Sequence, residues 1–161
     1  MAFIGKAGCG KTTLANYLVH SNNFVKLSFA THLKRIAEEI LIRPIDKTNP
    51  LDRKFLQQLG TELGRARQKD IWIQHFHKSF RNTKQCDYVV DDCRFLNEAE
   101  YLKSNGFIII KITGRQLDLG DNAKHASEVE QDQIKADCEI NNNGTLEETI
   151  EILDNILGGN I

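Results

Sequence analysis

The chain has 161 residues, of which 40% are hydrophobic and 27% charged, and its formal net charge is −1. These values are typical of one globular domain and exclude an intrinsically disordered chain. Because 21 Lys and Arg residues are balanced by 22 Asp and Glu residues, the composition argues against binding nucleic acid by bulk charge. No apolar run approaches the roughly 18 residues of a membrane-spanning helix.

The first half of the chain has two strand patterns and a long helical stretch. Strands are predicted at 1–4 and 24–28. Apolar residues at helical spacing, or a helix start after a glycine-rich turn, predict four helices, at 11–20, 33–41, 55–63 and 72–80. Since no strand pattern interrupts residues 30–80, we expect this segment to be a helical substrate arm. Both prolines lie between Arg43 and Asp52, which predicts a loop or hinge there.

The second half alternates strands with helices. Strands are predicted at 88–90, 107–112 and 138–140, and helices at 95–104 and 146–157. Two capping boxes, Ser127 with Glu130 and Thr145 with Glu148, each predict the start of a helix. Because parallel strands need helical crossovers, we expect a three-layer α/β fold with a parallel five-stranded sheet.

Residues 5–12, GKAGCGKT, match the phosphate-binding pattern GxxxxGK[ST] in full. Glycines let backbone N–H groups turn toward phosphate oxygens, and the start of the next helix adds a positive dipole end. Lys11 can then reach the β- and γ-phosphates, and the Thr12 hydroxyl can ligate Mg²⁺. The pattern predicts the P-loop of an ATP-binding protein, whose residues there are Gly5, Ala7, Gly8, Cys9, Gly10, Lys11, Thr12 and Thr13.

An acidic pair, Asp91 and Asp92, ends the strand predicted at 88–90. A P-loop protein needs such a carboxylate near its Mg²⁺ ion. Since neighbouring strand residues face opposite ways, we expect one of the two to address the metal and leave open which. The lack of an NKxD pattern argues against a GTPase, and the helical insert favours a small-molecule kinase.

Taken in order, these segments resemble the phage-type deoxynucleoside monophosphate kinases, within the wider nucleoside monophosphate kinase group. The resemblance covers nearly the full length. It rests on GKAGCGKT at 5–12, LSFATHLK at 27–34, LQQLGTELGR at 56–65 followed by Trp72, DDCRFLNEAE at 91–100, HASE at 125–128 and INNNGTLEE at 140–148. Leu96 and Ala126 stand where the family usually has proline.

The resemblance implies roles for the matching positions. Arg65 and Arg94 would hold the acceptor monophosphate or the transferring group, and with Lys11 and Asp92 they would form the catalytic set. Arg115, Asn142 and Asn143 would surround the ATP adenine, and residues 115–128 would form a short lid. The substrate-binding residues implied are Ser28, Arg65, Trp72, Asp92, Arg94, His125 and Glu128.

Several of these positions have a purely structural alternative. Arg65 could pair with Glu62 along a helix, and Trp72 could be a core residue. The capping box alone explains Ser127, next to Glu128. His125 is equally open to either interpretation.

The predicted reaction transfers the ATP γ-phosphoryl group to a nucleoside monophosphate, deoxy by resemblance, in one P-loop kinase domain spanning 1–161. The acceptor phosphate oxygen is already ionised, so no general base is needed. The alternatives are dephospho-CoA kinase or another small-metabolite kinase, and a P-loop module that binds ATP without a small acceptor. We expect a cytoplasmic monomer or homodimer (in the host cytoplasm, if viral) with no nucleic-acid or membrane partner.

Overall fold

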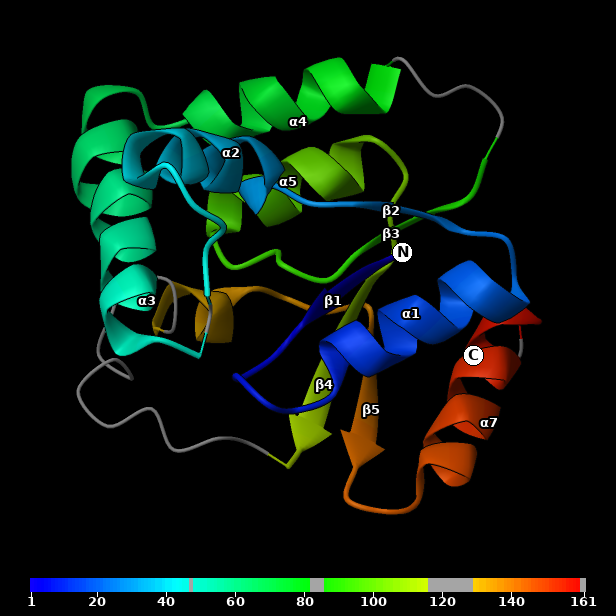
Figure 1. Ribbon diagram of the computed structural model, residues 1–161. Helices are drawn as coiled ribbons and strands as arrows, with labels where there is room; N and C mark the ends of the chain where they lie inside the picture. The colour runs from blue at the N-terminus through cyan, green and yellow to red at the C-terminus, as the bar shows by residue number, and fades with distance from the viewer. Residues whose placement is uncertain (47, 82–85, 116–128, 160–161) are drawn as a thin grey trace. The chain divides into compact units, whose positions relative to one another are not determined.

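A computed structural model describes residues 1–46, 48–81, 86–115 and 129–159, and its strands form one five-stranded sheet (Figure 1). The strands are β1 (Ala2–Ile4), β2 (Val25–Leu27), β3 (Tyr88–Val90), β4 (Ile109–Gly114) and β5 (Cys138–Asn142). They lie in the order β2-β3-β1-β4-β5. β1 pairs in parallel with β3 and β4, and β4 pairs in parallel with β5. The expected parallel α/β fold is confirmed.

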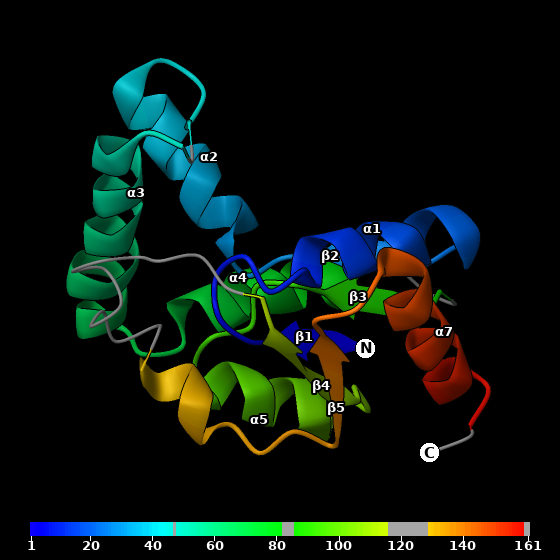
Figure 2. The same cartoon turned by 90° about the horizontal axis from the view of Figure 1, so that it is seen from below.

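Two compact units divide the chain: Met1–Lys26 with Gln85–Ile161, and Leu27–Lys84. The first, which we call the sheet unit, carries the helices α1 (Lys11–Ser21), α5 (Leu96–Ser104) and α7 (Leu146–Leu157) and the 3₁₀ turn η3 (Glu130–Gln133). α1 and α7 lie on one side of the sheet and α5 on the other (Figure 2). Both faces are therefore covered, which explains why the neighbouring residues Ile109 and Ile110 of β4, which face opposite ways, are both fully buried.

Alternate residues of the strands supply the core between the sheet and the helices α1 and α7. Phe3, Ile110 and Ile140 point to the side where Leu18 of α1 and Leu153 of α7 pack, and all five are fully buried. β4 begins at Ile109, two residues later than predicted, because the Phe107 amide still donates to the last turn of α5 at Leu102 O (3.0 Å). β5 extends two residues beyond its predicted end.

The capping box at the start of α7 is confirmed: the Glu148 amide donates to Thr145 Oγ1 (3.2 Å) and the Thr145 amide donates to Glu148 Oε2 (2.8 Å). These bonds satisfy backbone donors that a helix start would leave unpaired. Ser127 of the other predicted box lies outside the described residues.

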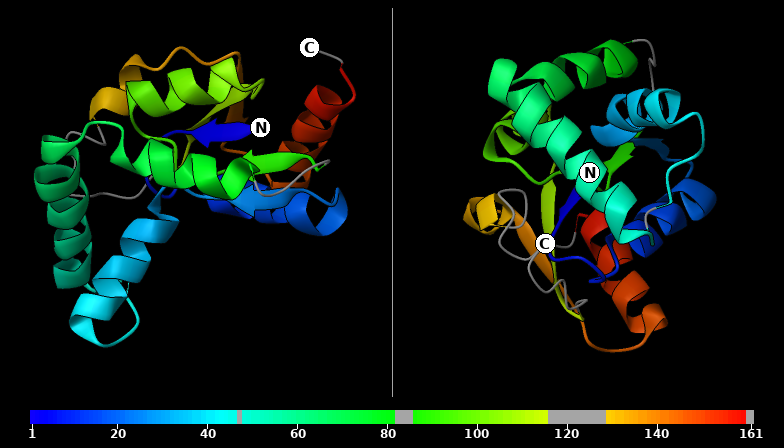
Figure 3. Two further views of the ribbon diagram at one scale, coloured as in Figure 1. Left: turned by 90° about the horizontal axis from the view of Figure 1, so that it is seen from above. Right: turned by 60° about the vertical axis from the view of Figure 1, so that its left-hand side comes forward.

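The second unit, which we call the helical unit, contains α2 (Ala30–Leu41), α3 (Pro50–Gln57), η1 (Gln58–Arg65) and α4 (Ile71–Arg81). η1 is a π-helix that continues α3 as one rod (Figure 3). Side chains from other helices pack directly against its two glycines. A Cβ built on Gly60 would lie 2.9 Å from Leu33, and one built on Gly64 would lie 2.8 Å from Trp72, so larger residues would displace these side chains. The Trp72 indole N–H donates to Gly60 O (2.9 Å) and so ties α4 to η1.

An ion pair joins the exposed Arg43, which follows α2, to the buried Asp52 of α3. Asp52 accepts from Arg43 Nη1 (2.7 Å) and Nη2 (2.6 Å), and also from the Asp46 amide (2.9 Å). The side chain of Asp52 is only 3% exposed. The Arg43 guanidinium is the main reason that the pKa of this carboxyl falls from 3.8 to about 2. The pair thus joins Arg43 and Asp46 to the first turn of α3, within the segment predicted as a loop or hinge.

We predict that Asp52→Asn lowers the melting temperature at pH 7 and weakens its acid dependence. The unfolded chain takes up a proton near pH 3.8, whereas the folded Asp52 resists protonation until a pH of about 2. The stability contributed by Asp52 is thus present above pH 3.8 and lost as the pH falls through that window. Thermal melts at pH 7 and pH 3, with exposed Glu151→Gln as control, measure this. If the melting temperature falls between pH 7 and pH 3 by as much in Asp52→Asn as in the wild-type chain, the prediction is wrong.

Candidate active site

Polar side chains gather where the parallel strands of the sheet unit end. β1 runs into the glycine loop at Gly5, β3 into Asp91, β4 into Arg115, and β5 ends at Asn142. The carboxyl ends of parallel strands meet at one edge of the sheet, which is where ligands bind in open α/β sheets. Sequence-predicted donor-site residues from four segments are thus brought to a common edge.

The glycine loop, residues 5–10, links β1 to α1, as its sequence pattern requires. Gly5, Gly8 and Gly10 all have positive φ, at 137°, 81° and 104°. A Cβ on Gly5 would overlap the carbonyl oxygen of Ile112 in β4, and one on Gly10 would overlap the Asn142 amide. Only glycine permits both this backbone and this close approach to the sheet edge.

Lys11 folds back over the loop that precedes it. Its ammonium donates to Gly5 O (2.5 Å) and Lys6 O (2.8 Å), and lies 3.6 Å from Cys9 Sγ. Lys11 is 8% exposed, unusually buried for a lysine. The loop's own carbonyl oxygens thus solvate this charge at the place where the sequence predicts phosphate oxygens.

A small polar cluster joins three parts of the sheet unit: Thr12 of α1, Lys26 of β2 and Asp91 after β3. The Thr12 hydroxyl donates to Asp91 Oδ2 (2.7 Å), and the Lys26 ammonium binds the same oxygen (2.7 Å). The Asp91 side chain is 10% exposed, and that of Lys26 31%. Sequence reasoning missed Lys26, although a charged residue within the apolar strand pattern 24–28 was a usable signal.

The segment after Asp91 is held by a buried carboxylate. Glu98 is 2% exposed, and its Oε2 accepts from the backbone amides of Arg94 (2.8 Å) and Phe95 (3.2 Å). Asp92 and Arg94 are partly buried beside it. Glu98 therefore fixes the backbone that carries Arg94, a role that the sequence did not reveal.

At the other end of the edge, Asn142 supports the glycine loop. Its amide N donates to Cys9 O (2.9 Å), and its Oδ1 accepts from the buried Thr149 hydroxyl (2.9 Å). The Arg115 guanidinium donates to Gly144 O (2.7 Å), so the chain after β4 is tied to the loop after β5. The predicted adenine contacts of Arg115 and Asn142 stay predictions, as does that of Asn143.

The predicted acceptor residues lie mostly in the helical unit. Ser28 lines a pocket there, and Arg65 ends η1 with its Nη1 donating to Lys69 O (3.3 Å). Trp72 is 5% exposed and packs on Gly64, so it is a core residue of this unit. Its predicted contact with substrate stays a prediction. His125 and Glu128 lie outside the described residues.

The oxygen atoms beside the glycine loop suit a hard divalent cation. Mg²⁺ is usually held by one or two protein oxygens together with substrate phosphates, and the Thr12 hydroxyl and Asp91 carboxylate are such a pair. Within the part of the chain that the structure describes, no three His, Cys, Asp or Glu side chains are grouped as a metal cage. A dedicated all-protein metal site is therefore not what the described residues offer.

No helix among the described residues is long and apolar enough to cross a membrane.

Comparison with known proteins gives two sequence matches of the same kind. A family model described as deoxynucleotide monophosphate kinase matches residues 40–152. A protein of Acanthamoeba polyphaga mimivirus, named "Putative deoxynucleotide monophosphate kinase", is 34% identical, and the alignment covers 92% of this chain and 90% of the viral protein.

The fold is similar to that of solved proteins that differ in sequence. Shikimate kinase from Aquifex aeolicus superposes with a TM-score of 0.56 at 15% identity, covering 99% of this chain and 97% of that one. The protein TT1252 from Thermus thermophilus gives 0.57 at 16% identity, with 98% and 95% covered. At these identities the likeness shows the fold alone.

We predict that Lys26→Met destabilises the chain by about 1–2 kcal/mol, because it leaves a mostly buried Asp91 carboxylate without its ammonium partner. Lys26→Arg should retain most of the stability. Asp91→Asn removes the charge, so Lys26→Met should cost less in that background. Urea unfolding of the two single variants and the double variant measures the coupling. Strictly additive losses contradict the predicted interaction.

Proposed function

The chain belongs to the deoxynucleotide monophosphate kinase family, and we propose how its residues divide the family's reaction between them. The chain is a kinase that transfers a phosphoryl group from ATP to a deoxynucleoside monophosphate. Lys11, Thr12 and Asp91 serve the ATP side, and Arg65 and Arg94 serve the acceptor side. The observation that carries this proposal is the contact of Thr12 with Asp91 beside a complete glycine loop.

On the ATP side, the proposal begins with the glycine loop. Its backbone N–H groups and the N-terminus of α1 favour negative phosphate oxygens. Lys11 exchanges the carbonyl oxygens of Gly5 and Lys6 for phosphate oxygens, because its three N–H donors can be redirected without moving the backbone. Arg115, Asn142 and Asn143 enclose the adenine, and residues 115–128 form the lid.

Mg²⁺ fits the same place and, when bound, neutralises charge on the phosphates. We propose Thr12 and Asp91 as the residues that hold it, with Asp92 beside them. Asp91 is favoured over Asp92 by its hydrogen bond with the Thr12 hydroxyl. Glu98 keeps the following backbone in place through its two amide bonds.

On the acceptor side, the proposal follows from charge. ATP and a nucleoside monophosphate together carry about six negative charges at neutral pH, and fixed cations must offset those that Mg²⁺ and Lys11 leave. Arginine binds two phosphate oxygens at once and stays charged. Arg94 follows the strand end, and Arg65 ends the π-helix of the helical unit, the segment 30–80 that we propose as the acceptor arm.

The remaining acceptor residues are proposed from the family pattern. Ser28, Trp72, His125 and Glu128 complete the set of substrate-binding residues. The family match favours this acceptor over dephospho-CoA and over a module without a small acceptor. We further propose the cytoplasm as the location, the host's if the chain is viral, and a monomer or homodimer as the assembly.

We predict that Lys11→Met lowers kcat by at least 100-fold with little change in melting temperature, because Lys11 stabilises charge on the transferring group. Coupled ADP release with ATP, Mg²⁺ and a panel of ribo- and deoxyribonucleoside monophosphates measures it. The matched control is Lys103→Met, which removes an exposed lysine of α5 that pairs with Asp137. If no nucleoside monophosphate increases the rate of ADP release, the proposed function is wrong.

For the acceptor clamp, we predict that Arg65→Ala raises the acceptor KM about 10-fold or more while the ATP KM changes little. Arg94→Ala should also lower kcat, since it is proposed to touch the transferring group. Each substrate is varied in turn, with exposed Arg67→Ala as control. If both variants weakened ATP alone, the two arginines would belong to the donor site.

A further inference from the structure

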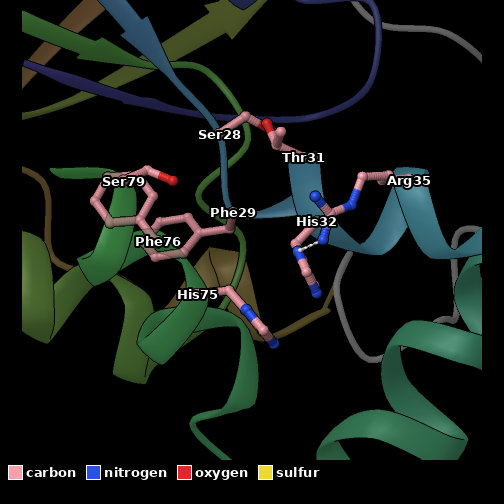
Figure 4. Close-up of a pocket in the computed structure, with 8 residues that line it drawn as sticks. All are labelled: Ser28, Phe29, Thr31, His32, Arg35, His75, Phe76 and Ser79. Carbon is pink, nitrogen blue, oxygen red and sulfur yellow. Dashed lines mark hydrogen bonds between the residues drawn. The ribbon is translucent and has the colours of Figure 1, made fainter. Parts of the chain in front are cut away.

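A small pocket within the helical unit lies between the start of α2 and the face of α4 (Figure 4). Its volume is about 150 Å³. Aromatic rings, imidazoles, hydroxyls and one guanidinium line it. Of these residues, the proposed function assigns only Ser28. The chemistry of the others indicates what the pocket can hold.

Two stacked ring pairs give the pocket flat walls. Phe29 and Phe76 stack with centroids 4.3 Å apart and an interplanar angle of 24°. His32 and His75 stack with centroids 3.6 Å apart and an angle of 15°. Both phenylalanines are buried, so this pair is a fixed part of the unit. Flat aromatic walls favour a flat aromatic ligand over a sugar or an alkyl chain.

The volume limits the size of that ligand. A cavity of about 150 Å³ in a protein accepts a molecule as large as benzene. One six-membered ring therefore fits, whereas the second ring of a purine needs the walls to move. His75 belongs to the stacked pair and is the wall residue whose removal would enlarge the pocket.

The polar groups of the pocket are three hydroxyls, two imidazoles and the Arg35 guanidinium, of which only the guanidinium donates without accepting. Arg35 Nη2 lies 3.1 Å from His32 Nδ1, and since a guanidinium only donates, His32 Nδ1 accepts. The neutral His32 ring then carries its proton on Nε2. Among the described residues that line the pocket, none has a carboxylate. The donor-only Arg35 guanidinium, with no carboxylate beside it in this lining, favours carbonyl oxygens on the edge of the ring.

The histidines stay neutral near pH 7. Desolvation lowers the pKa of His32, with a further decrease from Arg35 and Lys78 that Glu39 opposes. Desolvation and the neighbouring His32, Lys78 and Arg35 lower the pKa of His75. The stacked pair therefore adds no charge that would require an anionic ligand.

We propose that this pocket binds the base of the acceptor nucleotide and selects a pyrimidine with two ring carbonyls, as in thymine or uracil, over a purine. The proposal rests on the proposed function, because it takes the acceptor to be a nucleoside monophosphate. It extends that function by naming the substrate class and by giving His32, Arg35 and His75 a part in specificity.

The first experiment compares kcat/KM for dTMP, dUMP, dCMP, dGMP and dAMP at saturating ATP and Mg²⁺. We expect dTMP and dUMP to exceed both purine nucleotides at least 10-fold, with dCMP between them. Equal or better use of dGMP or dAMP overturns the pocket proposal and leaves the kinase function intact. If the chain phosphorylates none of the five nucleotides, the proposed function itself is overturned.

Two variants test the walls and the polar edge separately. His75→Ala should raise kcat/KM for dGMP and dAMP relative to dTMP at least 5-fold, because it removes one wall. Arg35→Met should reduce the ratio of dTMP to dCMP, because it removes a donor to a carbonyl. His77→Ala on the same helix is the matched control, since His77 is not among the residues lining the pocket. Unchanged ratios in both variants contradict the proposal.

A binding readout covers the case in which a variant folds poorly. In the wild-type chain without ATP, titration with dTMP should shift the imidazole proton resonances of His32 and His75, and thymidine alone should shift them too. The imidazoles of His20 and His77, which are not assigned to any site, should not shift. Shifts with inorganic phosphate but not with thymidine would show an anion site instead and overturn the assignment to a base.

Discussion

The position of β1 between β3 and β4 decides what the glycine loop can touch. Because all three strands run in parallel, the loop leaves β1 at the edge where β3 delivers Asp91 and β4 presents the Ile112 carbonyl. Gly5 lies so close to that carbonyl that any side chain would push the loop off the sheet. Such a shift would separate Thr12 from Asp91, so a backbone constraint at one residue supports the polar contact at another.

Buried and partly buried polar side chains extend this constraint to the rest of the edge. Glu98 holds the backbone at Arg94, and Asn142 joins Cys9 in the loop to Thr149 in α7. In the described residues, no buried side-chain nitrogen or oxygen lacks a partner. A buried group left unpaired is costly, so each of these residues is fixed by the contacts that it must make, and the loop rests on a rigid base.

Local sequence patterns were sufficient to predict most strands and helices of this molecule, but not the contacts between residues far apart in the sequence. The five strands, the glycine loop and the Thr145 capping box follow from residues adjacent in sequence, and so they could be predicted. The π-helix could not, because Leu33 and Trp72, which pack on its glycines, come from other helices. Lys26 was missed for the same reason, because its partner Asp91 follows another strand. Glu98 was missed although its partners, the amides of Arg94 and Phe95, are close in sequence.

The donor site satisfies its own charges before any nucleotide arrives. Loop carbonyls take the place of phosphate oxygens on Lys11, and the Lys26 ammonium places a positive charge on the carboxylate proposed for a divalent cation. Binding of ATP therefore exchanges partners, and its affinity reflects the difference between two well-solvated states rather than the sum of new contacts. An exchange of this kind needs flexible side chains on a fixed backbone. Two lysines beside a glycine loop held by β4 and Asn142 meet that requirement.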